Sequence, residues 1–256
     1  MTNDDLIQQA AAILRSAHNL AVLTGAGVSR ESGVPTFRDS QEGLWAKFDP
    51  EELATPAAFK RNPKLVWDWY EYRRSQLRQA RPNPGHMALA QLEAYFPVVL
   101  IITQNVDDLH EQAGSTHVIH LHGNIARNKC FANCQGDPTL IDLAQIADDR
   151  DDGPPKCPHC GAYIRPDVVW FHEMLPADAI QDARAAAQRC DVMLVVGTSG
   201  LVQPAASLPQ TARQRGAKII EVNPSDTAIT PLADIKLTGP SGVILPQLVE
   251  ALSTDE

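Results

Sequence analysis

VLTGAGVSRESGVPTFRD, residues 22–39, decides the fold class of this chain. Its apolar run leads into a Gly-Ala-Gly turn, where missing side chains let backbone N–H groups approach a pyrophosphate, and Ser29 can add a hydroxyl donor. Arg30 stands where the usual dinucleotide fingerprint has its third glycine, and a polar loop follows. The stretch predicts a nucleotide-binding turn, although such a turn alone can also be a simple strand-to-helix connection.

Continuous apolar runs recur along the chain and suit strands that are buried on both faces of a parallel sheet. Helical segments with readable starts alternate with them, which predicts an α/β fold with a doubly wound, mainly parallel, Rossmann-like sheet. The predicted strands are residues 20–24, 98–103, 118–121, 191–197 and 218–222. The predicted helices are about 3–17, 64–79, 86–95, 178–189, 203–215 and 243–253.

Two segments do not fit the sheet and predict a smaller second domain. One is helical without strands, and the other is rich in Cys, Pro, Asp and Gly. We therefore expect a Rossmann-like domain from residues 1–39, 86–123 and 166–256, and a small domain from residues 40–85 and 124–165, which is a helical module plus a zinc module.

Composition limits the partners of this chain. It has 256 residues, of which 44% are hydrophobic, and a formal net charge of -9, which argues against nucleic acid as a direct partner. The negative net charge is compatible with basic protein segments as partners. We expect no membrane span, because no apolar run approaches the roughly 20 residues that one needs, and we expect a cytoplasmic protein, because MTNDDLIQQA lacks the features of a secretory signal.

Four of the five cysteines lie in two close pairs, C-x3-C and CPHC. Four thiolates in this pattern predict a tetrahedral structural zinc site, and the alternative is four unrelated buried thiols. His159, inside the second pair, is not expected to be a ligand, and Cys190 is expected to be a small buried hydrophobe. The predicted ligands are Cys130, Cys134, Cys157 and Cys160.

Polar side chains follow several predicted strands directly, where ligand groups usually gather in such folds. Unpaired polar groups at these positions cost stability, so a ligand is the expected partner. Capping of a helix by Asn105 is the alternative, but it accounts for only one of them. They are Gln104, Asn105 and Asp107 after one strand, Thr198 and Ser199 after another, and Asn223 after a third.

The stretch HLHGN contains two histidines, His120 and His122, at the end of a predicted strand. We expect them to point to opposite faces, one as a base and the other in packing. Gly123 is expected to give a ligand close access beside His122.

The order of these motifs resembles the sirtuin family of NAD-dependent protein lysine deacylases over about residues 20–248. The resemblance implies that NAD is consumed: nicotinamide is released and the acyl group of a modified lysine passes to ADP-ribose, giving O-acyl-ADP-ribose. A polar loop that closes over the cofactor suits this reaction. The motifs are GAGVSRESGVPTFR, TQNVDDLH, LHGN, the two cysteine pairs, RPDVVWFHE, GTS and VNP.

The resemblance also implies roles for individual residues. His122 matches the catalytic base, His120 is left as packing, and Asn105 and Asp107 act near the nicotinamide end. The segment Val168, Val169, Trp170 and Phe171 matches the one that pairs with a substrate peptide. The residues expected around NAD are Gly25, Ala26, Gly27, Ser29, Arg38, Gln104, Asn105, Asp107, Gly197, Thr198, Ser199, Asn223 and Ser241.

Tyr70 and Arg73 are three residues apart on a predicted helix and share a face, so a phenol hydroxyl and a guanidinium can together receive a carboxylate. The same Y-x-x-R pair occurs in the sirtuin class that removes succinyl and malonyl groups. The alternative is an ordinary amphipathic helix with surface ion pairs. Three positions depart from the family: His172 replaces a usual glycine, Ser241 replaces a frequent alanine, and C-x3-C replaces C-x-x-C.

Two other function classes fit the same motifs. One is an NAD hydrolase or ADP-ribosyltransferase, and the other is a non-catalytic module that senses NAD.

Overall fold

The computed structural model describes residues 2–35, 48–146 and 153–253. The chain divides into two compact units. The first, called here the sheet unit, is Met1–Thr36, Arg81–Leu121 and Ala177–Glu256. The second, called the small unit, is Phe37–Ala80 and His122–Pro176.

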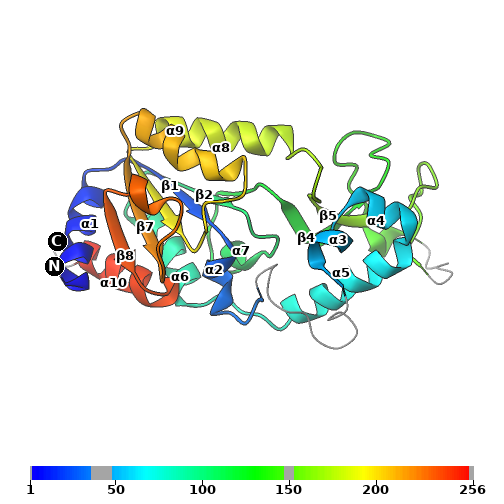
Figure 1. The fold of residues 1–256 in the computed structure, drawn as a ribbon, viewed down its shortest axis with the longest axis horizontal. Helices are drawn as coiled ribbons and strands as arrows, with labels where there is room; N and C mark the ends of the chain where they lie inside the picture. Colours follow the sequence, from blue (N-terminus) through cyan, green and yellow to red (C-terminus); the bar gives the residue numbers. More distant parts are fainter. Residues whose placement is uncertain (1, 36–47, 147–152, 254–256) are drawn as a thin grey trace. The chain divides into compact units, whose positions relative to one another are not determined.

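The sheet unit is built on a parallel sheet with the strand order β3-β2-β1-β6-β7-β8 (Figure 1). The chain runs outward in one direction from β1 and then returns to continue on its other side from β6, which places the topological switch point between these two strands. The strands are β1 (Asn19–Thr24), β2 (Val98–Thr103), β3 (Val118–His120), β6 (Val192–Val196), β7 (Lys218–Asn223) and β8 (Ile235–Thr238). The predicted parallel sheet is confirmed, and only β8, a short strand at its edge, was missed.

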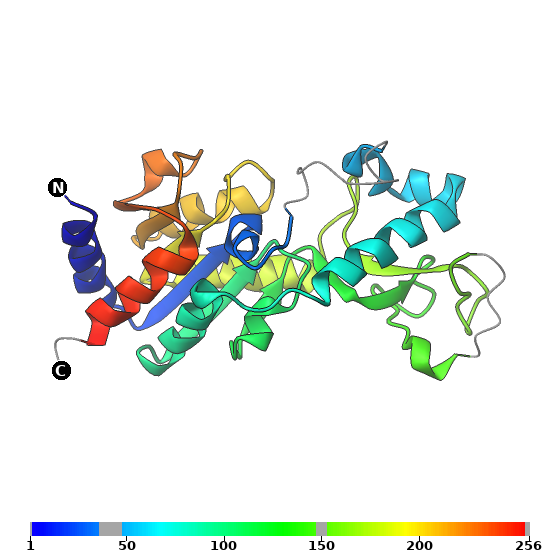
Figure 2. The same cartoon turned by 90° about the horizontal axis from the view of Figure 1, so that it is seen from below.

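Helices cover both faces of this sheet, which is why its strands are continuously apolar. Figures 1 and 2 show α1 (Asn3–Arg15), α6 (Pro84–Gln91) and α10 (Ser241–Ser253) on one face. On the other face lie α8 (Ala177–Arg189) and α9 (Leu208–Gln214). Shorter helices are α2 (Ala26–Arg30), α7 (Leu109–Gln112), η2 (Leu92–Ala94), η4 (Ala205–Ser207) and η5 (Thr230–Leu232).

The Gly-Ala-Gly turn needs its glycines because the backbone of the turn after β1 contacts the backbone of the turn after β6. Gly25 caps the short helix α2, and the N–H of Gly27 donates to the carbonyl of Gly197 at 2.8 Å. A Cβ atom on Gly27 would lie 2.7 Å from the Gly197 backbone. Glycine at these positions therefore lets the end of β1 pack against the end of β6.

The small unit pairs two antiparallel strands with a helical module. β4 (Gly123–Cys130) pairs with β5 (Ile164–Val168), and the helices are α3 (Pro50–Leu53), α4 (Pro56–Arg61), α5 (Pro63–Leu77) and the turn η3 (Leu143–Gln145). Thr55 and Asn62 cap α4 and α5 ahead of their first-turn prolines, as their sequence signals predict. Among the described residues, no helix is long and apolar enough to cross a membrane.

The buried Arg74 joins α5 to β4. Its Nε donates to the Ile125 carbonyl at 2.6 Å, and one Nη donates to Asn128 Oδ1 at 2.7 Å. This side chain is 8% exposed, and it also forms an ion pair with the partly exposed Glu71 at 2.6 Å, so the alternative of an ion pair on this helix holds for Arg74 although its side chain is buried. Its contacts hold the face of α5 that carries Tyr70 and Arg73.

Among the described residues, the unit boundaries differ from the predicted domain boundaries at residues 81–85, 122–123 and 166–176. Residues 81–85 belong to the sheet unit, where the Asn83 side chain donates to the carbonyl of Val28 at 2.7 Å. Residues 122–123 and 166–176 belong to the small unit, because β5 continues its pairing with β4 up to Val168 opposite Gly123. Contacts between segments far apart in the chain, which no local pattern displays, set these boundaries.

Candidate active site

Ser29, Asn105 and Asp107 form a buried polar cluster beyond the ends of β1 and β2. The Asn105 amide donates to Ser29 Oγ at 2.9 Å, and Ser29 Oγ donates to Asp107 Oδ2 at 3.0 Å. Burial raises the pKa of the Asp107 carboxyl. The structure thus joins residues that are 76 and 78 positions apart along the chain into one hydrogen-bonded group.

His86 also belongs to this cluster, although no sequence motif indicates it. Its Nδ1 accepts from the Asn83 N–H at 3.3 Å, so Nε2 carries the proton, and Nε2 lies 3.5 Å from Ser29 Oγ. Burial lowers the pKa of His86 to about 4. The residue looks like part of an ordinary Asn-Pro helix start, and only the packing of α6 shows where its ring lies.

Further expected cofactor residues lie at the ends of the later strands. Gln104 Nε2 donates to Thr198 Oγ1 at 3.0 Å, and Asn223 Nδ2 donates to the Thr198 carbonyl at 2.9 Å. Ser199 is exposed beside them. These contacts bring the GTS and VNP motifs together at the carboxyl edge of the sheet.

Ser241 begins α10, and its hydroxyl donates to Glu31 Oε2 at 3.2 Å. The same carboxylate accepts the Gly242 N–H at 2.8 Å. Glu31 therefore caps α10 and ties it to the polar loop. Ala26 is half-buried in the glycine turn, and Arg38 lies outside the described residues.

The expectation of two histidines on one strand is wrong. β3 ends at His120, while His122 lies in the turn before β4 and belongs to the small unit. Two residues apart on one strand, they would in fact have faced the same side; the end of the strand separates them. His120 is not simple packing either, because its Nε2 pairs with Glu111 Oε1 at 2.5 Å.

The backbone conformation and a close contact with β5 require glycine at position 123, so the expected role in ligand access is not needed to explain Gly123. Its φ is +76°, and a Cβ atom there would lie 2.1 Å from the Asp167 carbonyl oxygen on β5. The neighbouring His122 carbonyl accepts the Val169 N–H at 2.9 Å. The close approach of β5 therefore shapes the backbone that carries His122.

Tyr70 and Arg73 do share a face of α5. The buried Tyr70 hydroxyl accepts from Trp170 Nε1 at 2.8 Å, and burial raises the Tyr70 pKa. The Arg73 guanidinium carbon lies 5.7 Å from the centre of the Tyr70 ring and 5.1 Å from that of Trp69. The pair therefore sits in an aromatic environment within the small unit.

The segment after β5 is not a strand in this structure. The N–H groups of Val169, Trp170 and Phe171 donate to the His122 carbonyl, Glu173 Oε2 and the Ala54 carbonyl, at 2.9, 2.8 and 2.9 Å. A peptide that pairs with this segment would therefore meet its carbonyl oxygens. Phe171 is exposed, whereas Val168 and Trp170 are buried.

Arg165 holds the turn that follows. Its guanidinium makes two contacts with the Glu173 carboxylate, at 2.5 and 3.0 Å, and lies 3.2 Å from the centre of the Trp170 ring. Within this turn His172 has a φ of +70°, in the left-handed region that favours glycine. This conformation explains why glycine suits the position.

Replacing His172 by glycine is expected to stabilise the fold. The left-handed conformation costs a side-chain-bearing residue about 1–2 kcal/mol, and the extra freedom of glycine when unfolded offsets about 0.5–1 kcal/mol of the gain. Urea unfolding should show a gain of about 0.5–1 kcal/mol. The matched control His172→Ala should give no gain, and equal stability of all three proteins would contradict the strain.

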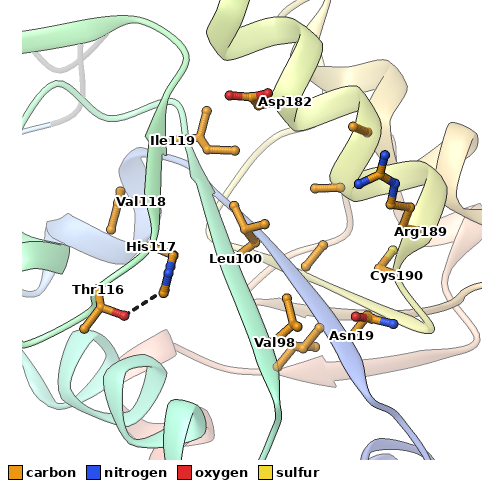
Figure 3. A pocket seen from close by; sticks show the side chains of 14 residues that line it. Asn19, Val98, Leu100, Thr116, His117, Val118, Ile119, Asp182, Arg189 and Cys190 are labelled. Atoms are coloured by element: carbon orange, nitrogen blue, oxygen red, sulfur yellow. Dashed lines mark hydrogen bonds between the residues drawn. The ribbon is translucent and has the colours of Figure 1, made fainter.

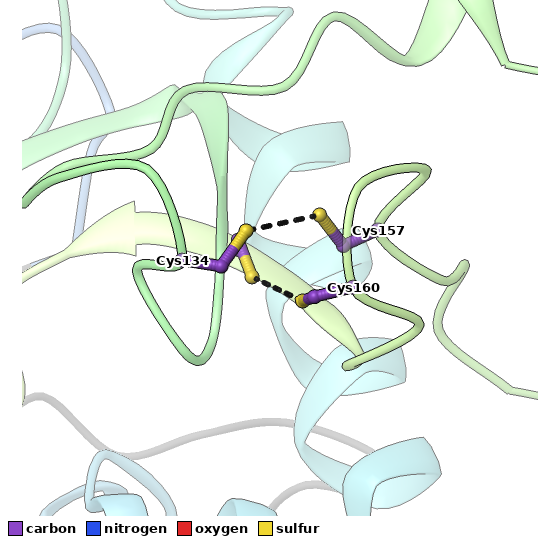
Figure 4. A group of neighbouring side chains, drawn as sticks. Cys134, Cys157 and Cys160 are labelled. Atoms are coloured by element: carbon purple, nitrogen blue, oxygen red, sulfur yellow. Dashed lines mark hydrogen bonds between the residues drawn. The ribbon is translucent and has the colours of Figure 1, made fainter.

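The four paired cysteines are positioned to hold a zinc ion (Figure 4). Their Sγ atoms all lie within 4.8 Å of one another, with Cys130 to Cys160 at 3.5 Å and Cys134 to Cys157 at 3.9 Å. Tetrahedral ligation at Zn–S distances of about 2.3 Å places sulfurs about 3.8 Å apart, so the geometry fits. Asn133, with a φ of 45°, turns the longer C-x3-C loop, and His159 is exposed outside the group.

A separate groove of about 600 Å³ lies in the sheet unit, and none of the expected site residues line it (Figure 3). It is bounded by the early parts of β1 and β2, by β3 and by α8. Cys190, the fifth cysteine, is buried at its edge, and burial raises its pKa to about 11, as befits a small buried hydrophobe.

Comparison with known proteins identifies the family. A sequence model of the Sir2 family matches residues 25–204. A protein named NAD-dependent protein deacylase from Pyrococcus abyssi is 49% identical over 244 residues, covering 95% of this chain and 97% of its own length. A crystal structure of a Sir2 homologue in complex with NAD is 45% identical, with a TM-score of 0.86 and coverage of 96% of this chain and 93% of that one. A Sir2 structure bound to a myristoylated histone peptide is 36% identical, with a TM-score of 0.75 and coverage of 97% and 96%. This chain belongs to the Sir2 family.

Proposed function

We propose that this protein is an NAD-dependent protein lysine deacylase that releases nicotinamide and O-acyl-ADP-ribose. The observation that carries the proposal is the buried group of Ser29, Asn105 and Asp107 beyond the carboxyl ends of β1 and β2. A carboxamide and a carboxylate kept there by a shared hydroxyl offer both a donor and an acceptor to a polar ligand. The relative from Pyrococcus abyssi described above is named an NAD-dependent protein deacylase.

In this proposal the sheet unit binds NAD. The glycine turn from Gly25 to Gly27, at the start of α2, receives the pyrophosphate, and Asn105 and Asp107 act at the nicotinamide end. Gln104, Thr198 and Asn223, which are hydrogen-bonded to one another, support the ribose side. The other cofactor contacts are Ala26, Ser29, Arg38, Gly197, Ser199 and Ser241.

In this proposal the small unit supplies the base and the acyl-lysine site. His122 accepts a proton from a ribose hydroxyl, the general-base role in which enzymes use imidazole most often. Val168 to Phe171 receive the substrate peptide. The zinc ion held by the four cysteines is structural, because four thiolates leave no coordination position for substrate.

Peptide assays with NAD separate this proposal from its rivals. Acetyl-lysine and succinyl-lysine peptides should each release nicotinamide only when peptide and NAD are both present, with acyl-ADP-ribose as the product seen by mass spectrometry. Nicotinamide release without peptide would instead indicate an NAD hydrolase, and labelled ADP-ribose on protein would indicate a transferase. NAD binding without any turnover would indicate a sensing module.

The acyl groups removed include acidic ones such as succinyl and malonyl. The supporting observation is the placement of Arg73 over the Tyr70 ring on one face of α5, next to Trp170. A guanidinium presents N–H donors that match the two oxygens of a carboxylate, and such charge-assisted hydrogen bonds are stronger than neutral ones. The charge and the phenol hydroxyl therefore favour an acyl chain that ends in a carboxylate.

Replacing Arg73 by methionine should lower kcat/KM on a succinyl-lysine peptide by about 10-fold to 100-fold, because a charge-assisted contact contributes about 1.5–3 kcal/mol. Activity on the acetyl peptide should change by less than about 3-fold, and steady-state kinetics on both peptides measures the difference. Arg78→Met, an exposed arginine at the end of the same helix, is the matched control and should leave both activities intact. Equal losses on both peptides with Arg73→Met would place the carboxylate site elsewhere.

In the part of the chain that the structure describes, no disulfide joins the cysteines, which leaves Cys130, Cys134, Cys157 and Cys160 available as metal ligands. The proposed partners of this activity are acylated proteins.

A further inference from the structure

The buried side chain of His110 is not used by the proposed mechanism. It lies on α7 and is 1% exposed, and its Nε2 lies 3.0 Å from Thr24 Oγ1. Its Nδ1 is buried and has no hydrogen-bond partner among the described residues. A leucine would fill such a site without leaving a buried nitrogen unpaired, so packing alone does not account for a histidine here.

The proton positions around His110 follow from its neighbour. The Thr24 hydroxyl donates to Thr103 Oγ1 at 2.9 Å, which uses its single hydrogen. Nε2 of His110 must therefore donate to Thr24, and Nδ1 is the unprotonated nitrogen of a neutral ring. Burial lowers the His110 pKa to about 3, which keeps this tautomer neutral across the working range of pH.

The chain of hydrogen bonds ends at Asn105. Thr103 Oγ1 accepts the Asn105 backbone N–H at 3.0 Å, in addition to the Thr24 hydroxyl. Thr24 and Thr103 are paired in register as the last residues of β1 and β2, and both are fully buried. The relay from His110 through Thr24 and Thr103 therefore fixes the backbone of Asn105 at the edge of the sheet.

Asn105 is thus held at two points. Thr103 holds its backbone, and Ser29, next to His86, holds its carboxamide. The His86 and His110 rings lie with their centres 5.0 Å apart, so both anchors begin in one packed pair of neutral rings. A carboxamide fixed in this way keeps its direction without reorganising when a ligand binds, and small displacements of such groups are costly to catalysis.

We propose that His110 is a positioning residue that acts through Thr24 and Thr103 to hold Asn105 in its reactive orientation. The role of Asn105 rests on the proposed deacylase function; the hydrogen-bond relay itself does not. His110 acts on the orientation of a group at the nicotinamide end and not on the affinity for either substrate.

Kinetics of His110→Leu and His110→Gln test the relay. The leucine variant should lower kcat by about 10-fold, the effect expected of one positioning hydrogen bond, with KM for NAD and for the acyl peptide changed by less than about 2-fold. Glutamine carries an N–H donor that can still reach Thr24, so His110→Gln should restore kcat to within about 3-fold of the wild type. An unchanged kcat in the leucine variant, or equal losses in both variants, would overturn the proposal.

Thr24→Val removes the middle hydroxyl of the same relay without a large change in side-chain volume. This variant tests the proposal even if His110→Leu does not fold. It should lower kcat by about 10-fold. The double variant His110→Leu/Thr24→Val should show no larger loss of kcat than either single variant, because the residues act as one unit. Thr211→Val on α9, whose hydroxyl donates to the Ser207 carbonyl at 3.1 Å, is the matched control and should leave kcat unchanged. Losses that multiply in the double variant would contradict a shared relay.

Amide hydrogen exchange supplies a readout that does not depend on turnover. The Asn105 N–H should exchange about 10-fold faster in His110→Leu and Thr24→Val than in the wild type or in Thr211→Val. If the wild type shows no peptide-dependent nicotinamide release, the proposed function fails, while this exchange comparison still decides the relay. Unchanged exchange at Asn105 in both variants would overturn it.

Discussion

The variant His122→Ala is expected to lose almost all deacylase activity while it remains folded and binds NAD. General-base catalysis contributes about 10²-fold to 10⁴-fold, so kcat should fall by at least about 100-fold. Because the imidazole moves a proton and does not hold the cofactor, the Kd for NAD from calorimetry should change by less than about 3-fold. The side chain belongs to the small unit, so the sheet unit should be unaffected.

His120→Ala is the matched control for this experiment. His120 pairs with the partly exposed Glu111, an interaction of the kind that contributes less than about 1 kcal/mol, so its loss should mainly lower the unfolding temperature slightly. Total loss of turnover in both variants, with both proteins folded, would leave His122 without a special role.

Replacing Cys157 by alanine is expected to remove the metal and unfold the small unit. Apparent binding energies of structural zinc are on the order of 10 kcal/mol in isolated modules, and few folds of this size tolerate such a loss. Cys157 also packs with Trp67 and Ile164, so its loop would lose both its metal and its apolar support. Zinc content, circular dichroism and activity should all fall together.

Cys190→Ala is the control for a buried thiol outside the metal group. It should keep one zinc per chain and change the unfolding free energy by about 1 kcal/mol. Removing zinc from the wild type with a chelator should reproduce the effect of Cys157→Ala. A Cys157→Ala protein that is folded, active and free of metal would show that the site is not structural.

The sheet could be predicted closely because its signals are local. Residues 98–103 are continuously apolar and form β2 with the same bounds, and Asn62-Pro63 starts α5 as expected. The spacing of the cysteine pairs likewise predicts a four-thiolate group. β8 was missed because a short edge strand is half exposed and its four residues alternate, which leaves little apolar signal.

Most residues of the candidate site could be named from the sequence, but the hydrogen bonds between them could not. Asn105 and Asp107 are visible as polar residues after an apolar run, whereas the partner that joins them, Ser29, lies more than 70 residues earlier. His86 lies in no motif, and His110 ends the TQNVDDLH motif without an assigned role, because a histidine inside a short helix is ordinary until its surroundings are known. Arg165 was passed over within RPDVVWFHE for the same reason.

The sequence by itself determined the alternation of strands and helices, the glycine turn, the helix caps and the four metal ligands, since each depends on neighbours within a few residues. Only the tertiary structure decided that Gly123 makes room for the Asp167 carbonyl, that β3 ends between His120 and His122, and that two buried histidines anchor Asn105. These features depend on hydrogen bonds and close contacts between segments far apart in the chain. Such contacts form only when the apolar faces have packed, so no local pattern of residues displays them.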